Sequence, residues 1–234
     1  MLKIQNFTKI YGNKKAVDGL NLEIAPGEIY GFIGHNGAGK TTTLKSICGI
    51  LDFDEGEILI EGKNIKKSPV ECKKQLAYIS DDPMLYGFMS GIKYLNFIAD
   101  VYGVNKTERE ERINKYTELF DIKKDLAQNI ESYSHGMQQK LAICAALVHS
   151  PKLLILDEPF VGLDPKASHD LKKIMRELCD NGGAIFFSTH VLEVAEKLCD
   201  KIAIIKNGKL VVSGTTEQVR GDTSLEEVFL ELVE

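Results

Sequence analysis

The sequence predicts an α/β fold in which helices cover both faces of a mostly parallel sheet. Three features of the chain lead to this prediction. Short apolar runs of strand length alternate with segments of helical spacing, a glycine-rich turn follows one such run, and a long central stretch keeps helical spacing throughout. Alternating strands and helices favour parallel sheets, because a parallel crossover is long enough to hold a helix. The 234 residues are 44% apolar, which is enough to bury an ordinary core.

The first half of the chain supplies three expected strands and one expected helix. Residues 28–34 are interpreted as a buried strand that ends in glycine, and we expect it to be the first strand. A helix should follow from Lys40 to about Leu51. Residues 57–60 and 75–79 are short strand candidates that lie near turn-forming glycines.

A helical insertion is expected from about Tyr86 to Ser150. Strand signals are absent from this part of the sequence, and its charge rises. The apolar side chains of Ile113, Tyr116 and Phe120 recur at helical spacing and form one stripe.

Strands and helices alternate again after the insertion. The expected strands are 153–156, 184–189, 202–205 and 210–212, and the expected helices begin after Pro165 and span 192–198. Asn207-Gly208 between two apolar runs predicts a hairpin turn. Thr223 and Ser224 are candidate caps for a last amphipathic helix, with Glu226 and Glu227 in capping-box positions.

The turn after residues 28–34 has the composition of a phosphate-binding loop. It matches GxxxxGK[ST], in which glycines let successive backbone N–H groups point at phosphate oxygens and the next helix adds its positive N-terminal end. The lysine would bind the outer phosphates, and the hydroxyl after it would bind Mg²⁺. This pattern alone fits kinases, GTPases and ATPases equally. The expected nucleotide-binding residues are Gly34, His35, Asn36, Gly37, Ala38, Gly39, Lys40, Thr41 and Thr42.

Two acidic residues follow the apolar run 153–156, at the sheet edge where α/β proteins bind their ligands. Asp157 would bind Mg²⁺ together with Thr41, and Glu158 would act as general base toward the attacking water. Two exposed acids at the start of a loop are the simpler alternative, which the phosphate loop makes less attractive. His190 follows the strand 184–189, and a contact to the γ-phosphate competes there with a structural role.

Composition limits the possible function classes. A net charge of −5 without a basic stripe argues against nucleic acid as a partner. The five cysteines lack CxxC spacing, so we expect small buried hydrophobic residues in a reducing compartment. We expect no signal peptide, because the start turns polar at once, and no stretch approaches the roughly 20 apolar residues of a membrane span.

Several of these motifs occur together and in order, and the whole chain therefore resembles the nucleotide-binding subunits of ABC transporters. The matching segments are the phosphate loop 34–41, the signature-like segment Tyr133-Ser134-His135-Gly136-Met137-Gln138-Gln139-Lys140, the strand 153–158, the subunit-joining loop Gly162-Leu163-Asp164, and His190 as the switch histidine. The resemblance implies that Tyr11 stacks on adenine. It also implies one P-loop ATPase domain over 1–234: a core and antiparallel β-subdomain at about 1–85 and 151–234, with a helical subdomain at about 86–150.

The signature-like segment implies a partner. In the family, this helix end binds the γ-phosphate that a second subunit holds, so Ser134 and Gly136 would complete the nucleotide site of another chain. A serine N-cap without any ligand is the alternative. The second subunit could be another copy or a paralogue, and two ATP molecules would join the pair head to tail until hydrolysis separates them.

The sequence departs from the usual family pattern at two places. Tyr133, His135 and Met137 replace the first leucine, the first glycine and the glutamine of LSGGQ. Asp81 stands where the family usually has a glutamine that contacts Mg²⁺, and we expect it to bind the metal. These departures, together with residues 225–232, resemble the exporter subgroup whose membrane permease is a separate chain.

The resemblance implies a Mg²⁺-dependent ATPase that couples ATP hydrolysis to export by a partner permease. The subunit would lie peripherally on the cytoplasmic face of the membrane and be soluble when isolated. Two alternatives remain: an importer subunit, and a soluble ABC-type ATPase that acts on ribosomes or DNA. The second usually has two cassettes, coiled coils or basic arms, for which this sequence gives no sign.

Overall fold

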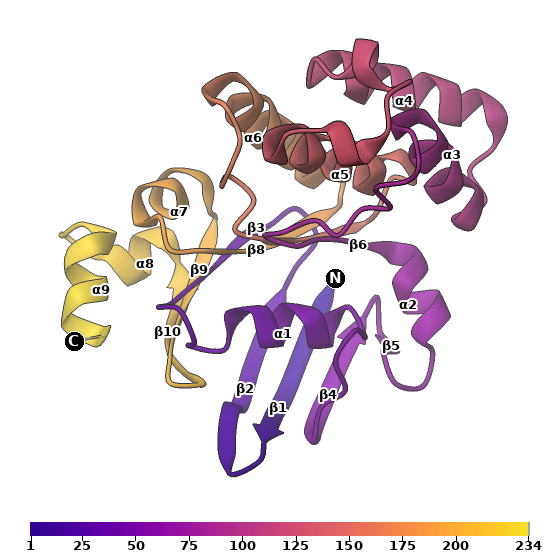
Figure 1. Ribbon diagram of the computed structural model, residues 1–234. Coiled ribbons are helices and arrows are strands. Elements are labelled where there is room, and N and C mark those ends of the chain that lie inside the picture. The colour runs from indigo at the N-terminus through magenta and orange to yellow at the C-terminus, as the bar shows by residue number, and fades with distance from the viewer. Residues whose placement is uncertain (234) are drawn as a thin grey trace. The chain divides into compact units, whose positions relative to one another are not determined.

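The computed structural model describes residues 1–233, and Figure 1 labels the helices and strands. The strands are β1 Leu2–Tyr11, β2 Lys14–Ile24, β3 Ile29–Ile33, β4 Glu55–Ile60, β5 Lys63–Asn64, β6 Leu76–Ile79, β7 Leu153–Asp157, β8 Ala184–Thr189, β9 Lys201–Lys206 and β10 Lys209–Thr215. The α-helices are α1 Lys40–Ile47, α2 Pro69–Gln75, α3 Gly91–Val101, α4 Lys106–Leu119, α5 His135–Val148, α6 Pro165–Asp180, α7 Leu192–Leu198, α8 Thr216–Arg220 and α9 Leu225–Val233.

Within residues 1–233, the strands form one four-stranded and one six-stranded sheet. The smaller sheet has the order β2-β1-β4-β5 and is antiparallel. The larger sheet has the order β10-β9-β3-β8-β7-β6, in which β3 pairs in parallel with β8 and β9, and β7 pairs in parallel with β8. The predicted α/β fold, with a mostly parallel sheet, an antiparallel sheet and inserted helices, is therefore confirmed.

The start of the chain corrects one prediction. We expected the first strand at 28–34, with Tyr11 before it, but β1 and β2 precede that strand, and Tyr11 is the last residue of β1. Irregularities interrupt the alternation of β1: its pairing with β2 shifts register between Ile4 and Phe7, where Asn6 has a φ of 48°. A regular two-residue period is the main sequence signal of a strand, and this interruption hides it.

The chain divides into two compact units. The first, called the sheet unit, comprises residues 1–78, 152–159 and those from 175 onward. It contains the two sheets apart from Ile79, and Figure 1 shows α7, α8 and α9 gathered beside β9 and β10. The second, called the helical unit, comprises residues 79–151 and 160–174, with α3, α4, α5 and the first part of α6.

Aromatic and aliphatic side chains fill the core of the sheet unit. Phe32 of β3 and Phe186 of β8 lie with ring centroids 5.3 Å apart, and neither is exposed. Leu44 and Ile47 of α1 are equally buried in the same cluster. Burial of such side chains is the main stabilising term of the fold, and it fixes α1 against β2 and β7.

The helical unit has its own core. Ile113 and Phe120 of the predicted stripe are buried, and helix α5 buries most of its residues from Leu141 onward. Arg112 of α4 donates to the carbonyl oxygen of Val148 at 3.0 Å, which joins α4 to the end of α5.

Two local predictions agree with the structure. Asn207 and Gly208 have φ values of 50° and 79°, as a tight hairpin turn between β9 and β10 requires. Ser224 caps α9, because its Oγ accepts the backbone N–H of Glu227 at 3.2 Å, whereas Thr223 donates to Arg220 instead.

All five cysteines are buried and free, as predicted. Burial raises the pKa of every one of these thiols, so none has the thiolate character that nucleophilic or redox chemistry requires.

Candidate nucleotide-binding site

The glycine-rich loop folds into a cradle between β3 and α1 in the sheet unit. Gly37 and Gly39 have φ values of 80° and 111°, which side chains disfavour. A Cβ on Gly34 would lie 2.6 Å from the carbonyl oxygen of Ile205, so backbone packing also excludes a side chain there. Helix α1 begins at Lys40 and places Thr41 and Thr42 in its first turn. The loop therefore presents a helix N-terminus and several backbone N–H groups on one side.

The Lys40 side chain is folded into this loop. Its Nζ donates to the carbonyl oxygens of Gly34 at 2.6 Å and His35 at 3.3 Å. The same Nζ lies 3.9 Å from Glu158 Oε1. Burial lowers the pKa of the Lys40 amino group, and the charges of Glu158 and Asp157 partly oppose this effect. The amino group is thus already positioned at the loop that would hold an anion.

Asp157 ends β7 as a buried carboxylate, with 2% of the residue exposed. Its Oδ1 accepts a hydrogen bond from Ser188 of the neighbouring strand β8. Its Oδ2 is buried and has no hydrogen-bond partner in the structure. An unpaired buried carboxylate oxygen is costly, and a bound cation satisfies it. Residues 1–233 contain no cluster of three His, Cys, Asp or Glu side chains for a metal, but Mg²⁺ commonly uses one carboxylate together with phosphate oxygens and water.

Glu158 is held in an unusual backbone conformation, with a φ of 48°. Its N–H donates to the carbonyl oxygen of Ser188 at 3.2 Å and to the Ser188 Oγ at 3.1 Å. A left-handed conformation costs a residue with a side chain about 1 kcal/mol, and such strain often occurs at functional sites. Here it fixes the direction in which the Glu158 side chain leaves the strand.

The carboxylate of Glu158 lies near two basic groups. Its Oε1 is 3.0 Å from Nδ1 of His190, and its Oε2 accepts the His190 backbone N–H at 3.3 Å. Lys40 Nζ lies 3.9 Å from the same oxygen, Oε1. The structure therefore brings together four of the predicted residues, from β7, from the end of β8 and from the phosphate loop: Lys40, Asp157, Glu158 and His190.

Tyr11 belongs to the same unit but to the antiparallel sheet. Its side chain is about half exposed, and Lys9 Nζ lies 5.2 Å from its ring centroid. The β1–β2 hairpin reaches the phosphate loop through Ala16, whose carbonyl oxygen would lie 2.6 Å from a Cβ on Gly39. An exposed ring on this hairpin fits the predicted stacking on a base.

The remaining predicted residues lie in the helical unit. Ser134 is the N-cap of α5 and accepts the backbone N–H of Met137 at 3.3 Å. A Cβ on Gly136 would lie 2.9 Å from the carbonyl oxygen of Gly162. Asp81 is exposed, and its Oδ1 accepts the backbone N–H of Asp82 at 3.0 Å.

Tyr133 shows how the altered signature segment packs. Its ring is buried, and its hydroxyl donates to the carbonyl oxygen of Asp125 at 2.8 Å. A Cβ on Gly91 would lie 2.4 Å from this hydroxyl oxygen. Burial raises the pKa of Tyr133, which keeps the hydroxyl protonated as a donor. The tyrosine in place of leucine is thus accommodated by a glycine and a backbone acceptor.

The sequence analysis missed the part that two residues play at the site. Ser188 binds both Asp157 and the Glu158 backbone, and Gly208 donates its N–H to the carbonyl oxygen of Ala38 in the phosphate loop at 3.0 Å. In the helical unit, Lys140 at the end of the signature-like segment forms an ion pair with Asp164 at 2.6 Å, a pairing that the sequence did not indicate. The polar end of the strand 184–189 was the available signal for Ser188, whereas the turn sequence around Gly208 gave only its hairpin.

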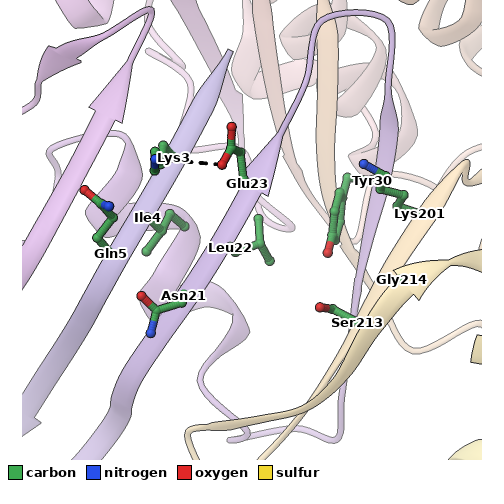
Figure 2. A pocket seen from close by; sticks show the side chains of 10 residues that line it. All are labelled: Lys3, Ile4, Gln5, Asn21, Leu22, Glu23, Tyr30, Lys201, Ser213 and Gly214. Carbon is green, nitrogen blue, oxygen red and sulfur yellow. Dashed lines mark ion pairs between the residues drawn. The ribbon is translucent and has the colours of Figure 1, made fainter.

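A separate groove of about 400 Å³ opens on the sheet unit. Figure 2 shows Tyr30 and Ser213 inside it, beside the ion pair of Lys3 and Glu23. Burial raises the pKa of Tyr30 to about 12. None of the predicted nucleotide-binding residues lines this groove, so it is not the candidate site.

The fold and the site together define the class of nucleotide-binding proteins with a phosphate loop and an acidic strand end. Residues 17–161 match the sequence profile of the ABC transporter family. The chain belongs to this family. No helix within the described part of the chain has the length and apolar character needed to cross a bilayer.

Two relatives from Bacillus subtilis (strain 168) and one solved structure illustrate the similarity. The ABC-type transporter ATP-binding protein EcsA is 34% identical over 99% of this chain and 96% of its own length. The linearmycin resistance ATP-binding protein LnrL is 33% identical over 97% of this chain and 74% of its own length. A structure described as the ATP-binding subunit of an ABC transporter has a TM-score of 0.96 and 34% identity, over 99% of each chain. The protein is an ATP-binding subunit of an ABC transporter.

Proposed function

We propose that this chain is the ATP-hydrolysing subunit of a membrane exporter. The position of Glu158 carries the proposal. Its carboxylate lies 3.9 Å from Lys40 Nζ and 3.0 Å from His190 Nδ1, at the end of the strand that also supplies Asp157. A carboxylate beside a phosphate loop is positioned to accept a proton from water that attacks the γ-phosphate.

Each predicted residue has a role in this proposal. The backbone of residues 34–39 binds the phosphates, and Lys40 exchanges its carbonyl partners for phosphate oxygens. Glu158 orients and deprotonates the attacking water, while His190 contacts the γ-phosphate. Tyr11 stacks on the adenine ring from the β1–β2 hairpin. These roles convert ATP binding into a reaction that breaks the bond to the γ-phosphate.

Mg²⁺ fits the same site. Asp157 offers an unpaired buried oxygen, and the Thr41 hydroxyl lies in the first turn of α1. We propose Asp81 as a further metal ligand. The metal would neutralise charge on the phosphate oxygens. If Asp81 has this role, Asp81→Ala raises the Mg²⁺ concentration needed for half-maximal hydrolysis. An unchanged metal dependence in that variant would remove Asp81 from the metal site.

A second ATP-binding subunit completes the site. Ser134 and Gly136 lie at the N-terminus of α5, where a serine hydroxyl and free N–H groups favour an anion. We propose that this helix end binds the γ-phosphate held by the partner, which is a second copy or a paralogue. ATP then joins two chains head to tail, and hydrolysis releases them. The whole of 1–234 acts as one ATPase domain, with its helical subdomain at about 86–150.

An exposed apolar surface on the helical unit supports a membrane permease as partner. Met84 and Phe88 are 93% and 77% exposed. Tyr86 contacts the rings of Phe88, Tyr94 and Phe97 with centroids 5.9–6.0 Å apart, so these aromatic side chains form one cluster. Contiguous exposed apolar side chains mark interaction sites. We propose that a cytoplasmic segment of the permease covers this cluster and holds the chain at the membrane.

Export, rather than import, is favoured by the similarity to a protein named for linearmycin resistance. A transporter that confers resistance to a compound is most simply one that removes it from the cell. The exporter-like departures at His135 and Asp81 point the same way. Nucleic acid is not among the proposed partners.

Affinity capture of the tagged chain from detergent-solubilised native membranes, followed by mass spectrometry, tests this proposal. We expect a polytopic protein without an ATPase domain to co-purify. The variant Phe88→Ser should lose this partner, whereas Val70→Ser, which changes an exposed apolar residue of the sheet unit, should retain it. Capture of ribosomal or nucleoid proteins alone would contradict the transport function and favour a soluble ATPase.

A further inference from the structure

The C-terminal helix α9 contacts the phosphate loop. The ring of Phe229 lies with its centroid 4.9 Å from that of His35, at an interplanar angle of 64°. This edge-to-face geometry is the favoured one for aromatic pairs. Phe229 is buried, although His35 belongs to an exposed turn of the loop. A residue near the C-terminus therefore packs directly on the loop that would hold the phosphates.

Helix α9 is fixed to elements on both sides of this contact. The N–H of Leu225, its first residue, donates to Glu196 Oε2 of α7 at 3.0 Å, and Glu196 also pairs with Arg220 at 3.1 Å. Helix α7 begins two residues after His190. Near the other end, Lys206 Nζ donates to the carbonyl oxygen of Leu232 at 3.4 Å. Helix α9 is therefore anchored near both ends, and this anchoring fixes the position of the Phe229 ring.

The backbone contacts of His35 explain why the ring contact with Phe229 matters. Its carbonyl oxygen accepts Lys40 Nζ at 3.3 Å and the N–H of Ala38 at 3.1 Å. When Lys40 turns to bind phosphate, its bonds to the carbonyl oxygens of Gly34 and His35 are lost. The ring contact to Phe229 does not involve Lys40, so it persists and keeps the His35 peptide in place. Preorganisation of this kind raises affinity because less ordering is required on binding.

We propose that Phe229 is a positioning residue for the phosphate loop and that helix α9 thereby sets nucleotide affinity. This inference rests on the proposed ATP-binding function and adds a residue that sets the affinity of the same site. The Phe229 ring contacts the side chain of His35, which has no assigned part in hydrolysis. Its loss should therefore weaken binding of both ATP and ADP and leave the rate at saturating ATP unchanged. An aromatic contact of this type corresponds to about a two- to tenfold change in Kd.

The test measures Kd for ATP and ADP by calorimetry, together with KM and kcat for hydrolysis. Phe229→Leu removes the ring but keeps an apolar side chain, and we expect Kd and KM to rise about two- to tenfold with kcat unchanged. Phe229→Tyr keeps the ring and should restore affinity. Leu230→Ala, at the next and exposed position of the same helix, is the matched control and should bind like the wild type.

A double-mutant cycle with His35→Ala decides whether the ring contact is the cause. If it is, Phe229→Leu has no further effect in the His35→Ala background. An equal loss in both backgrounds, or an unchanged Kd in Phe229→Leu, would overturn the inference. Should Phe229→Leu fail to fold, His35→Ala alone removes the contact from an exposed loop, and unchanged affinity there would overturn it as well. A wild-type chain that binds no ATP would instead refute the nucleotide site itself.

Discussion

The sheet unit and the helical unit differ in how their candidate functional residues are held. In the sheet unit, Lys40, Asp157, Glu158 and His190 are connected to one another directly or through Ser188, and most of these contacts involve buried groups. In the helical unit, Ser134 binds its own helix and Lys140 pairs with Asp164, whereas Asp81 lies exposed on a turn.

The functional groups of the sheet unit are thus already held in contact with one another, whereas those of the helical unit are exposed or bind only within that unit. The sheet unit holds a carboxylate, a cation and a phosphate loop within a few contacts, so it has the parts needed to bind a triphosphate. The helical unit offers a capped helix end and an exposed aromatic cluster, both of which suit a partner chain. Changes in the first unit should therefore affect chemistry and nucleotide affinity, and changes in the second should affect assembly.

The largest effect is expected for Glu158→Gln. The substitution keeps the size of the side chain but removes the carboxylate that we propose as general base, so hydrolysis should slow by about 10²- to 10⁴-fold while ATP still binds. Phosphate release under saturating ATP measures the rate, and calorimetry measures binding. A variant that hydrolyses ATP at the wild-type rate would show that the preorganised carboxylate is not the base.

A smaller effect, on binding, is expected for Lys40→Ala. Hydrogen bonds to charged groups contribute about 1.5–3 kcal/mol, so Kd for ATP should rise by roughly 10- to 150-fold. Lys45→Ala, a lysine of the last turn of the same helix, serves as the control and should leave Kd unchanged. Equal affinity in Lys40→Ala and the wild type would contradict the proposed cradle.

Next in size is a stability effect at Ser188. Its buried hydroxyl donates to Asp157 and accepts from the backbone of Glu158. Ser188→Ala leaves these buried groups short of partners, so the free energy of unfolding should fall by about 1–3 kcal/mol. Urea denaturation measures this loss, and Ser132→Ala, at an exposed serine of the helical unit, should change it much less. If Ser188→Ala and Ser132→Ala had the same midpoint and slope, the hydroxyl of Ser188 would make no special contribution to the free energy of unfolding.

The smallest effect is expected for Lys140→Met in the helical unit. Asp164 is about half exposed, so the ion pair is worth at most about 1 kcal/mol. The hydrogen bond from Lys140 lowers the pKa of Asp164, aided by the backbone N–H of Ala167. A lowered carboxyl pKa stabilises the fold above the unfolded value and loses that effect as pH falls through the folded value. The difference from the wild type should therefore begin to shrink below about pH 4, the unfolded value, and vanish only below the lowered pKa of the folded state. A difference that grows with acidity would contradict this pairing.

The local motifs of the candidate site could be predicted from the sequence, whereas contacts between distant segments could not. The phosphate loop, Asp157 and Glu158 follow local rules, because glycine spacing and an acidic strand end are readable in one short segment each. The strands β1 and β2 were missed because bulges near Asn6 break the alternation. Ser188 was missed because its role depends on β7 and β8 lying side by side, and the contact of Phe229 with His35 joins residues 194 positions apart. Such long-range pairs have no local signal.

The mass of Glu158→Gln in solution tests the central claim most directly, since the account has ATP joining two chains through Ser134 and the phosphate loop. Light scattering after size exclusion, with ATP and Mg²⁺, should give twice the mass of the single chain. The mass should return to that of one chain with ADP, or when Ser134→Ala is added. A variant that binds ATP and yet keeps the mass of one chain at every concentration would contradict the account.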